Sequence, residues 1–249
     1  LLQNIDQFPQ KKYFKNFQYK LNVPGETAKF WIKAQELINN DKKFKFLKTH
    51  NFLGLLGGNE FTNRKNTIGA VYIIRDPRNV ITSLKNHFEL SYDEALKFML
   101  NDKKFTYDYF KNNDFSDFTF ISSWEKNYQS WIKNKIFPVM IIKYEDLINQ
   151  TFFVFKDLIN FINKVTQNKN KFDKIKAQNS LESTSFTRLK NFEKNKNFKE
   201  SLDSKKNKSS KIPFFHLGPD NNWKKKLNED FQNKVNDIFK KNLKELKYI

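Results

Sequence analysis

The chain has 249 residues, and its 46 Lys and Arg against 27 Asp and Glu give a formal net charge of +19. Hydrophobic residues make up 38%, so the chain can bury a core and is too apolar for a disordered protein. It contains no Cys, which excludes disulfides and Cys-bound zinc and suits a reducing, cytoplasmic compartment. No run approaches the ~18 apolar residues of a membrane span, and residues 1–10 do not resemble a secretory signal.

The excess of positive charge has two interpretations. It could attract an anionic partner such as nucleic acid, a membrane surface or a phosphate-rich small molecule. Alternatively it reflects the Lys, Asn, Phe and Ile usage of an AT-rich genome. The lysines are spread along the whole chain, which favours the second interpretation.

The first half of the chain alternates between expected helices and strands. Apolar spacing predicts a helix over 26–40, and alternating Phe and Lys predict a short strand over 44–49. A Gly- and Asn-containing loop over 51–67 precedes a strand of buried type over 68–74. Asp76 and Pro77 are then typical of the N-cap and first residue of a helix ending near Phe88.

The second half continues the alternation. Its expected elements are a helix opened by a Ser91–Glu94 capping box, a helix with Trp124, Tyr128 and Trp131 on one face, a strand over 138–143, an apolar helix to about Asn163, a mobile low-complexity loop over 191–211, and a Lys-rich amphipathic helix over 229–246. Buried-type strands between helices predict one α/β domain over 1–249, with a central parallel sheet between two helical layers.

Polar residues follow three of the expected strands. These groups are Lys48-Thr49-His50, Arg75-Asp76 and Tyr144-Glu145. Ligands of such sheets bind at the carboxyl ends of the strands. A base, two cations and a phenol gathered there suit an anionic nucleotide and a group transfer beside it.

Five blocks of the chain resemble the cytosolic-type sulfotransferases, in the order in which that family has them. They are Lys48-Thr49-His50, VYIIRDPRNVITSLKNHF over 71–88, Tyr144-Glu145-Asp146-Leu147, Thr184-Ser185-Phe186, and FFHLGPDNNWK over 214–224. Each block alone is weak, but five in order make coincidence an unsatisfactory explanation. The resemblance implies a P-loop-like fold and transfer of a sulfuryl group from 3′-phosphoadenosine 5′-phosphosulfate (PAPS) to a hydroxyl or amine of a small acceptor.

The resemblance also implies a role for each matched residue. His50 is the general base, and Lys48 stabilises charge on the transferring group or on the bridging oxygen. The residues that match the family's nucleotide-binding positions are Arg75, Ser83, Tyr144, Thr184, Phe186, His216 and Gly218, with Arg75 and Ser83 on the 3′-phosphate and Phe186 on the adenine. No metal is implied.

Each of these residues also has a purely structural interpretation. His50 could simply close a strand, and Lys48 could be a solvated strand residue like Lys45. Arg75 could pair with a helix-starting acid, Ser83 could be an ordinary exposed helix residue, and Tyr144 and Phe186 could be core. Trp124 and Trp131 are interpreted as packing, because one-face helical spacing is typical of a core stripe.

The chain departs from the family pattern in two places. The Gly- and Ser-rich 5′-phosphosulfate loop, with its Lys, and the strand before it have no counterpart in residues 1–48. Either the sequence is N-terminally incomplete or the chain is a degenerate homologue. The lack of an initial Met and the intact later blocks favour incompleteness, and we expect the chain as given to be inactive. The late loop has His216-Leu217 where the family has Arg-Lys, so His216 is a weak substitute and Leu217 none.

Two other functions stay open at this point. A basic nucleic-acid-binding protein would agree with the charge, but no zinc-finger, RNA-recognition or helix-turn-helix signature is present, so we expect no specific nucleic-acid partner. A nucleotide kinase of related topology would need a Gly-rich Lys loop and Mg²⁺-binding acids, and neither is visible. The family's short dimer motif is absent, which leaves the oligomeric state open.

Overall fold

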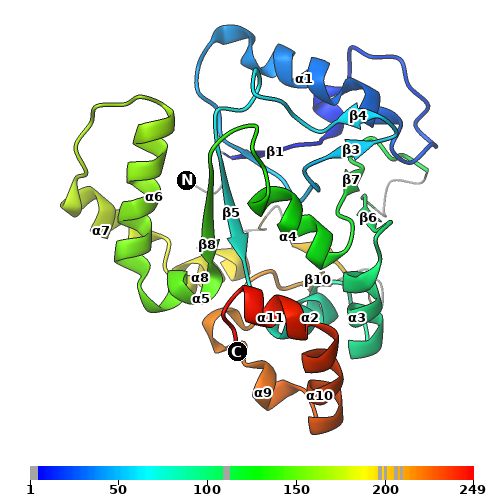
Figure 1. Ribbon diagram of the computed structural model, residues 1–249, viewed down its shortest axis with the longest axis vertical. Coiled ribbons are helices and arrows are strands. Elements are labelled where there is room, and N and C mark those ends of the chain that lie inside the picture. Colours follow the sequence, from blue (N-terminus) through cyan, green and yellow to red (C-terminus); the bar gives the residue numbers. More distant parts are fainter. Residues whose placement is uncertain (1–4, 109–112, 196–197, 199–200, 205–206, 208–209) are drawn as a thin grey trace. The chain divides into compact units, whose positions relative to one another are not determined.

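The computed structural model describes residues 5–108, 113–195, 198, 201–204, 207 and 210–249 (Figure 1). The chain divides into two compact units, which we describe separately. The first unit comprises Leu1–Tyr72, Met99–Ile141 and Val165–Gln167, and the second comprises Ile73–Phe98, Ile142–Lys164 and Asn168–Ile249. The assignment of 1–249 to a single domain stays a prediction.

The strands of the described residues are short and pair two by two. The pairs are β1 (Asp6–Gln7) with β2 (Leu47–Lys48), β3 (Leu55–Leu56) with β4 (Asn59–Glu60), β5 (Ala70–Ile74) with β8 (Val139–Lys143), β6 (Phe105–Thr106) with β7 (Thr119–Phe120), and β9 (Leu202–Asp203) with β10 (Lys211–Ile212). The β1–β2 pair is parallel, and the pairs β3–β4, β6–β7 and β9–β10 are antiparallel. The mixed α/β class is confirmed, although the described strands form separate pairs rather than the continuous sheet that we predicted.

The helices connect these strands. The α-helices are α1 (Trp31–Ile38), α2 (Pro77–His87), α3 (Tyr92–Leu100), α4 (Trp124–Ile132), α5 (Tyr144–Asn149), α6 (Thr151–Val165), α7 (Lys174–Ser183), α8 (Phe186–Asn195), α9 (Trp223–Lys226), α10 (Glu229–Ile238) and α11 (Lys240–Glu245). Short 3-10 helices cover Lys11–Tyr13, Glu26–Phe30, Asn39–Asp41 and Gly218–Asp220. Among the described residues, no helix is both long and apolar enough to span a membrane.

The core of the first unit is aromatic. Its buried cluster is Phe8, Phe14, Ala28, Trp31, Ala34, Leu53, Phe61, Phe118, Trp131 and Phe137. Trp131 stacks on Tyr72 of β5, with ring centroids 6.0 Å apart. The interpretation of Trp131 as a packing residue is therefore confirmed. Each aromatic side chain of this kind buries a large apolar area, so these rings contribute strongly to the stability of the first unit.

The second unit is built around α2. Figure 1 shows α2, α10 and α11 together at one end of that unit, and α2 also contacts α9. The buried apolar residues here include Ile74, Ile81, Leu227, Val235, Phe239, Leu243 and Leu246. The predicted helix over 229–246 is present as two helices, α10 and α11, which meet at Phe239.

Local signals placed two helix starts correctly. The Asp76 carboxylate accepts a hydrogen bond from the Arg78 amide at 2.9 Å, and Pro77 begins α2. At α3, the Ser91 amide donates to Glu94 at 2.7 Å and the Glu94 amide donates to the Ser91 hydroxyl at 3.2 Å, which is a complete capping box.

Other expectations need correction. The strand expected over 44–49 is reduced to Leu47–Lys48, and the loop expected over 51–67 contains the β3–β4 hairpin. The apolar helix after β8 is broken at Gln150 into α5 and α6. The loop expected over 191–211 contains the end of α8 and the β9–β10 pair, and its residues 196–197, 199–200, 205–206 and 208–209 lie outside the described residues.

Strand β5 also differs from its prediction. Its apolar run is typical of a strand covered on both faces. In the structure Val71 is 39% exposed and Ile73 is 55% exposed, while Ile74 is buried. The alternation shows that one face of β5 is packed and the other is open.

Candidate functional site

The candidate site is the turn where β5 ends and α2 begins, in the second unit. Arg75 directly follows β5, and the Asp76 cap starts α2 at the next residue. Ser83 lies two turns into that helix. The structure brings their side chains together, with Arg75 Nη1 and Ser83 Oγ 3.4 Å apart.

Two further predicted residues hold the Arg75 guanidinium. Its Nη2 donates to the Gly218 carbonyl oxygen at 3.1 Å, and its Cζ lies 4.1 Å from the centroid of the Tyr144 ring. Gly218 has a φ of +53°, and a Cβ there would lie 2.2 Å from Cε2 of Phe186. Glycine is therefore needed both for the backbone conformation and for the contact with the Phe186 ring.

The acidic groups near Arg75 are bound to other partners. Asp76 forms an ion pair with Arg78, at 2.7 Å between Oδ2 and Nη2. Glu145 accepts the Asp76 amide at 3.2 Å and the Tyr248 hydroxyl at 3.0 Å. Among the described residues, no carboxylate oxygen lies within 4.0 Å of the Arg75 guanidinium. Arg75 therefore keeps a positive charge that no ion pair with a described residue neutralises.

Burial makes the positive charge of Arg75 less stable, because the guanidinium loses part of its hydration. Desolvation lowers the pKa of Arg75 below its ordinary value, and the nearby Tyr144, Glu145 and Asp76 oppose the shift. Arg75 Nε is buried and has no hydrogen-bond partner in the part of the chain that the structure describes. A partly dehydrated guanidinium with an unused donor is well suited to an oxyanion, and its planar fork matches phosphate.

Asn221 is a site residue that the sequence interpretation missed. It is only 6% exposed, and its Nδ2 donates to Ser83 Oγ at 3.1 Å and to the Asn79 carbonyl oxygen at 3.0 Å. Its Oδ1 accepts from the Thr82 hydroxyl at 2.7 Å. Asn221 thus fixes the loop after Gly218 to α2. Asn221 lies in the block over 214–224 that resembles the family's phosphate loop, and this position could have identified it as a site residue.

His216 and Thr184 take different places. His216 is exposed overall, but partial desolvation of its ring lowers its pKa first, and the charges of Lys190, Lys226 and Lys85 lower it further. His216 is therefore mainly neutral at neutral pH. The Thr184 hydroxyl donates to the Ser180 carbonyl oxygen at 2.7 Å at the end of α7. Thr184 therefore terminates the helix that precedes Phe186.

His50 and Lys48 belong to the first unit. Lys48 lies in β2, paired with Gln7, and the His50 side chain is exposed. The backbone around His50 is held firmly: its carbonyl oxygen accepts from Asn127 Nδ2 at 3.2 Å. The next residue, Asn51, is 1% exposed, and its carbonyl oxygen accepts from Trp131 Nε1 at 3.1 Å.

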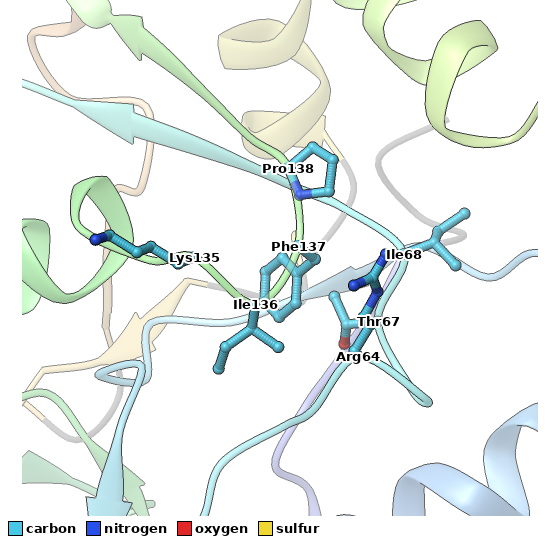
Figure 2. Close-up of a pocket in the computed structure, with 7 residues that line it drawn as sticks. All are labelled: Arg64, Thr67, Ile68, Lys135, Ile136, Phe137 and Pro138. Carbon is cyan, nitrogen blue, oxygen red and sulfur yellow. The ribbon is translucent and has the colours of Figure 1, made fainter.

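A surface hollow elsewhere in the first unit contains none of the predicted site residues. It is lined by Arg64, Thr67, Ile68 and residues 135–138. Figure 2 shows the Lys135 side chain pointing away from Arg64, so its two cations do not converge on one ligand. No group of three or more His, Asp or Glu that could hold a metal occurs among the residues that the structure describes.

Comparison with known proteins shows which family the chain belongs to. The model of the sulfotransferase domain family matches residues 7–247. The structure is similar to that of mouse sulfotransferase SULT7A1 complexed with PAP, with a TM-score of 0.51, 14% identity, and coverage of 84% of this chain and 69% of that one. It is also similar to retinol dehydratase in a complex with retinol and PAP, with a TM-score of 0.51 and 19% identity.

The retinol dehydratase comparison covers 82% of this chain and 54% of that one. At such identities the structural likeness establishes the fold alone. Sequence comparison with curated proteins gives no match. The family model nevertheless covers almost the whole chain, and its match agrees with the five motif blocks. The chain belongs to the sulfotransferase domain family.

Proposed function

We propose that the second unit of this chain binds the 3′-phosphate and adenine of PAPS, and that the protein serves in sulfuryl transfer to a hydroxyl or amine of a small acceptor. The observation that carries the proposal is the Arg75 guanidinium. It lies between Ser83, Gly218 and Tyr144, has a buried unused Nε, and lacks a carboxylate partner among the described residues. The two similar structures were both determined with PAP bound.

Each residue of the second unit that matches a nucleotide-binding position has a proposed part in binding. Arg75 and Ser83 donate to the 3′-phosphate, and the Phe186 ring stacks on the adenine. Tyr144 supports the guanidinium through its ring face, at 4.1 Å. Thr184 positions Phe186 by ending α7, while His216 and Gly218 form the loop that closes over the nucleotide.

The proposed chemistry is an in-line displacement at sulfur. The bond between sulfur and the donor's bridging oxygen breaks as a bond forms between sulfur and the acceptor oxygen or nitrogen. The acceptor's proton passes to a base, for which we propose the imidazole of His50, since neutral His is suited to this task near pH 7. Lys48 is the proposed partner for charge that develops on the bridging oxygen. No metal takes part in this scheme.

We expect the chain of 249 residues to show little or no transfer activity. Residues 1–48 contain no Gly- and Ser-rich loop with a Lys to hold the 5′-phosphosulfate in line. Positioning of this kind supplies up to about 7–11 kcal/mol of the barrier reduction in comparable reactions. Assays with PAPS and a panel of phenols, alcohols and amines test this expectation. Robust turnover would mean that another segment performs the positioning.

Calorimetric titration with adenosine 3′,5′-bisphosphate (PAP) tests the binding proposal without requiring activity. Replacing Arg75 with Ala should weaken PAP binding by about 2–5 kcal/mol, because a partly buried charge pair is lost. Adenosine 5′-monophosphate lacks the 3′-phosphate and should bind the two proteins almost equally. Arg64→Ala, which removes an exposed Arg of the first unit, is the matched control and should leave PAP affinity unchanged.

Three results would count against the proposal. The wild-type chain could fail to bind PAP, or Arg75→Ala could bind it with unchanged affinity. The third is binding to long DNA that weakens steeply with salt and is not displaced by PAP, which would instead favour the nucleic-acid interpretation.

A further inference from the structure

Lys190 lies beside the loop that contains His216 and Gly218, and no motif pointed to it. It is on α8, one turn after Phe186, and its side chain is half-buried. Its Nζ donates to the His216 carbonyl oxygen at 3.1 Å. Arg75 Nη2 donates to the Gly218 carbonyl oxygen, two residues further along the same loop.

Lys190 is linked to the nucleotide-binding residues a second time through Phe186. Its Nζ lies 5.7 Å from the centroid of the Phe186 ring, as the i, i+4 spacing on α8 allows. The same ring packs directly against Gly218. Lys190 and Arg75 therefore hold the same short loop, and Phe186 contacts both Gly218 and Lys190.

No acid in the described part of the chain forms an ion pair with Lys190. Its contacts are a neutral carbonyl oxygen and a ring face, and among the described residues it forms no ion pair. The positive field it creates is visible at His216, whose pKa is lowered first by burial and then by Lys190, Lys226 and Lys85. Three lysines therefore act on His216, while the Glu193 carboxylate accepts the Phe214 and Phe215 amides at 2.6 and 2.9 Å at the start of the same loop. The excess of positive charge at His216 favours binding of a polyanion over binding of a further cation.

We propose that Lys190 is a second cationic ligand for the 3′-phosphate side of the nucleotide, acting together with Arg75. This inference rests on the proposed function. It also accounts for the loop sequence: His216 and Leu217 bring no full positive charge, and Lys190 supplies one from the neighbouring helix. Binding requires Lys190 Nζ to exchange its bond to the His216 carbonyl oxygen for a phosphate oxygen, or to share the two.

Calorimetric titration with PAP and adenosine 5′-monophosphate tests the role of Lys190. Lys190→Gln keeps a donor for the His216 carbonyl oxygen but removes the charge, so it should weaken PAP binding about tenfold, as expected for loss of one charged hydrogen bond. Its affinity for adenosine 5′-monophosphate should change little. Lys190→Arg should retain PAP affinity. Arg188→Gln removes an exposed cation from the same helix and should match wild type.

The outcomes separate this inference from the proposed function. If wild type does not bind PAP, the proposed function fails and the inference with it. If wild type binds PAP, Arg75→Ala weakens it and Lys190→Gln does not, only the inference is overturned. Equal weakening of PAP and adenosine 5′-monophosphate would overturn the assignment to the 3′-phosphate. If Lys190→Gln does not fold, Lys190→Met, which preserves the aliphatic stem, gives the same comparison.

Discussion

Two strand ends carry the proposed chemistry, and the protein holds them in different ways. After β5, the side chain of Arg75 is fixed by contacts with Ser83, Gly218 and Tyr144. After β2, the backbone of His50 is fixed by Asn127, but its side chain is exposed. A binding residue must be oriented before its ligand arrives, whereas a base must reach a proton that only the acceptor brings. We therefore expect the proposed nucleotide binding and the proposed catalysis to be separable in this protein.

We expect the largest effect from His50→Ala, which should lower catalysis and leave nucleotide binding unchanged. In a version of the chain that is joined to a phosphosulfate loop and is active, this change should lower kcat by roughly 10²–10⁴-fold, because the acceptor's proton loses its base. On the chain as it stands, PAP affinity measured by calorimetry should be unchanged. Full transfer activity in the variant would show that His50 has only a structural role.

Gly218→Ala should lower PAP affinity, because Gly218 belongs to the loop that contacts Arg75 and Phe186. The positive φ costs a non-glycine residue about 1–3 kcal/mol, and the new Cβ would also collide with the Phe186 ring. Gly58→Ala is the matched control, since Gly58 has a φ of +80° but nothing within 4 Å of its Cβ position. Both variants should unfold at lower temperature, and only Gly218→Ala should lose PAP affinity.

Two results would contradict the assignment of PAP binding to the second unit alone. One is a loss of PAP affinity in Gly58→Ala, and the other is an unchanged PAP affinity in Gly218→Ala. The first result would link the hairpin of the first unit to the nucleotide. The second would mean that the contact between Gly218 and Phe186 is dispensable for binding.

A pH titration should show the smallest effect. The folded-state pKa of His216 is lowered, first by partial desolvation and then by nearby lysines, so the unfolded chain binds the proton more readily. The His216 contribution to stability is therefore present above the unfolded pKa of about 6.5 and is lost as pH falls below it. A bound phosphate favours the protonated form of His216, so PAP affinity should rise below about pH 6.5. The rise should be only about two- to threefold, because the His216 side chain is exposed to solvent. His216→Gln should abolish both dependences.

The parts of the fold that were predictable from the sequence are those set by near neighbours. The Asp76 and Ser91–Glu94 caps involve residues at most three apart, and both are present. The spacing of Arg75 and Ser83 is also local, because both positions belong to one strand-to-helix turn. Local chemistry of this kind is encoded directly in the order of residues.

The parts that could not be predicted depend on contacts between distant segments. Asn221 and Ser83 are 138 residues apart in sequence, and Lys190 and His216 are 26 apart. Each of these contacts exists only because α2, α8 and the loop at Gly218 pack together in the second unit. The open face of β5 was missed for a related reason: an apolar run shows that a strand can be covered, not that it is.

A crystal structure of the chain with PAP would show whether Arg75 and Ser83 bind the 3′-phosphate. We expect oxygens of the 3′-phosphate to lie about 3 Å from Arg75 Nη1 or Nη2 and from Ser83 Oγ, with the adenine against the Phe186 ring. Arg75 Nε, buried and without a partner in the described residues, should gain a hydrogen bond. A PAP molecule bound at another surface, with Arg75 still donating only to Ser83 and Gly218, would contradict the assignment.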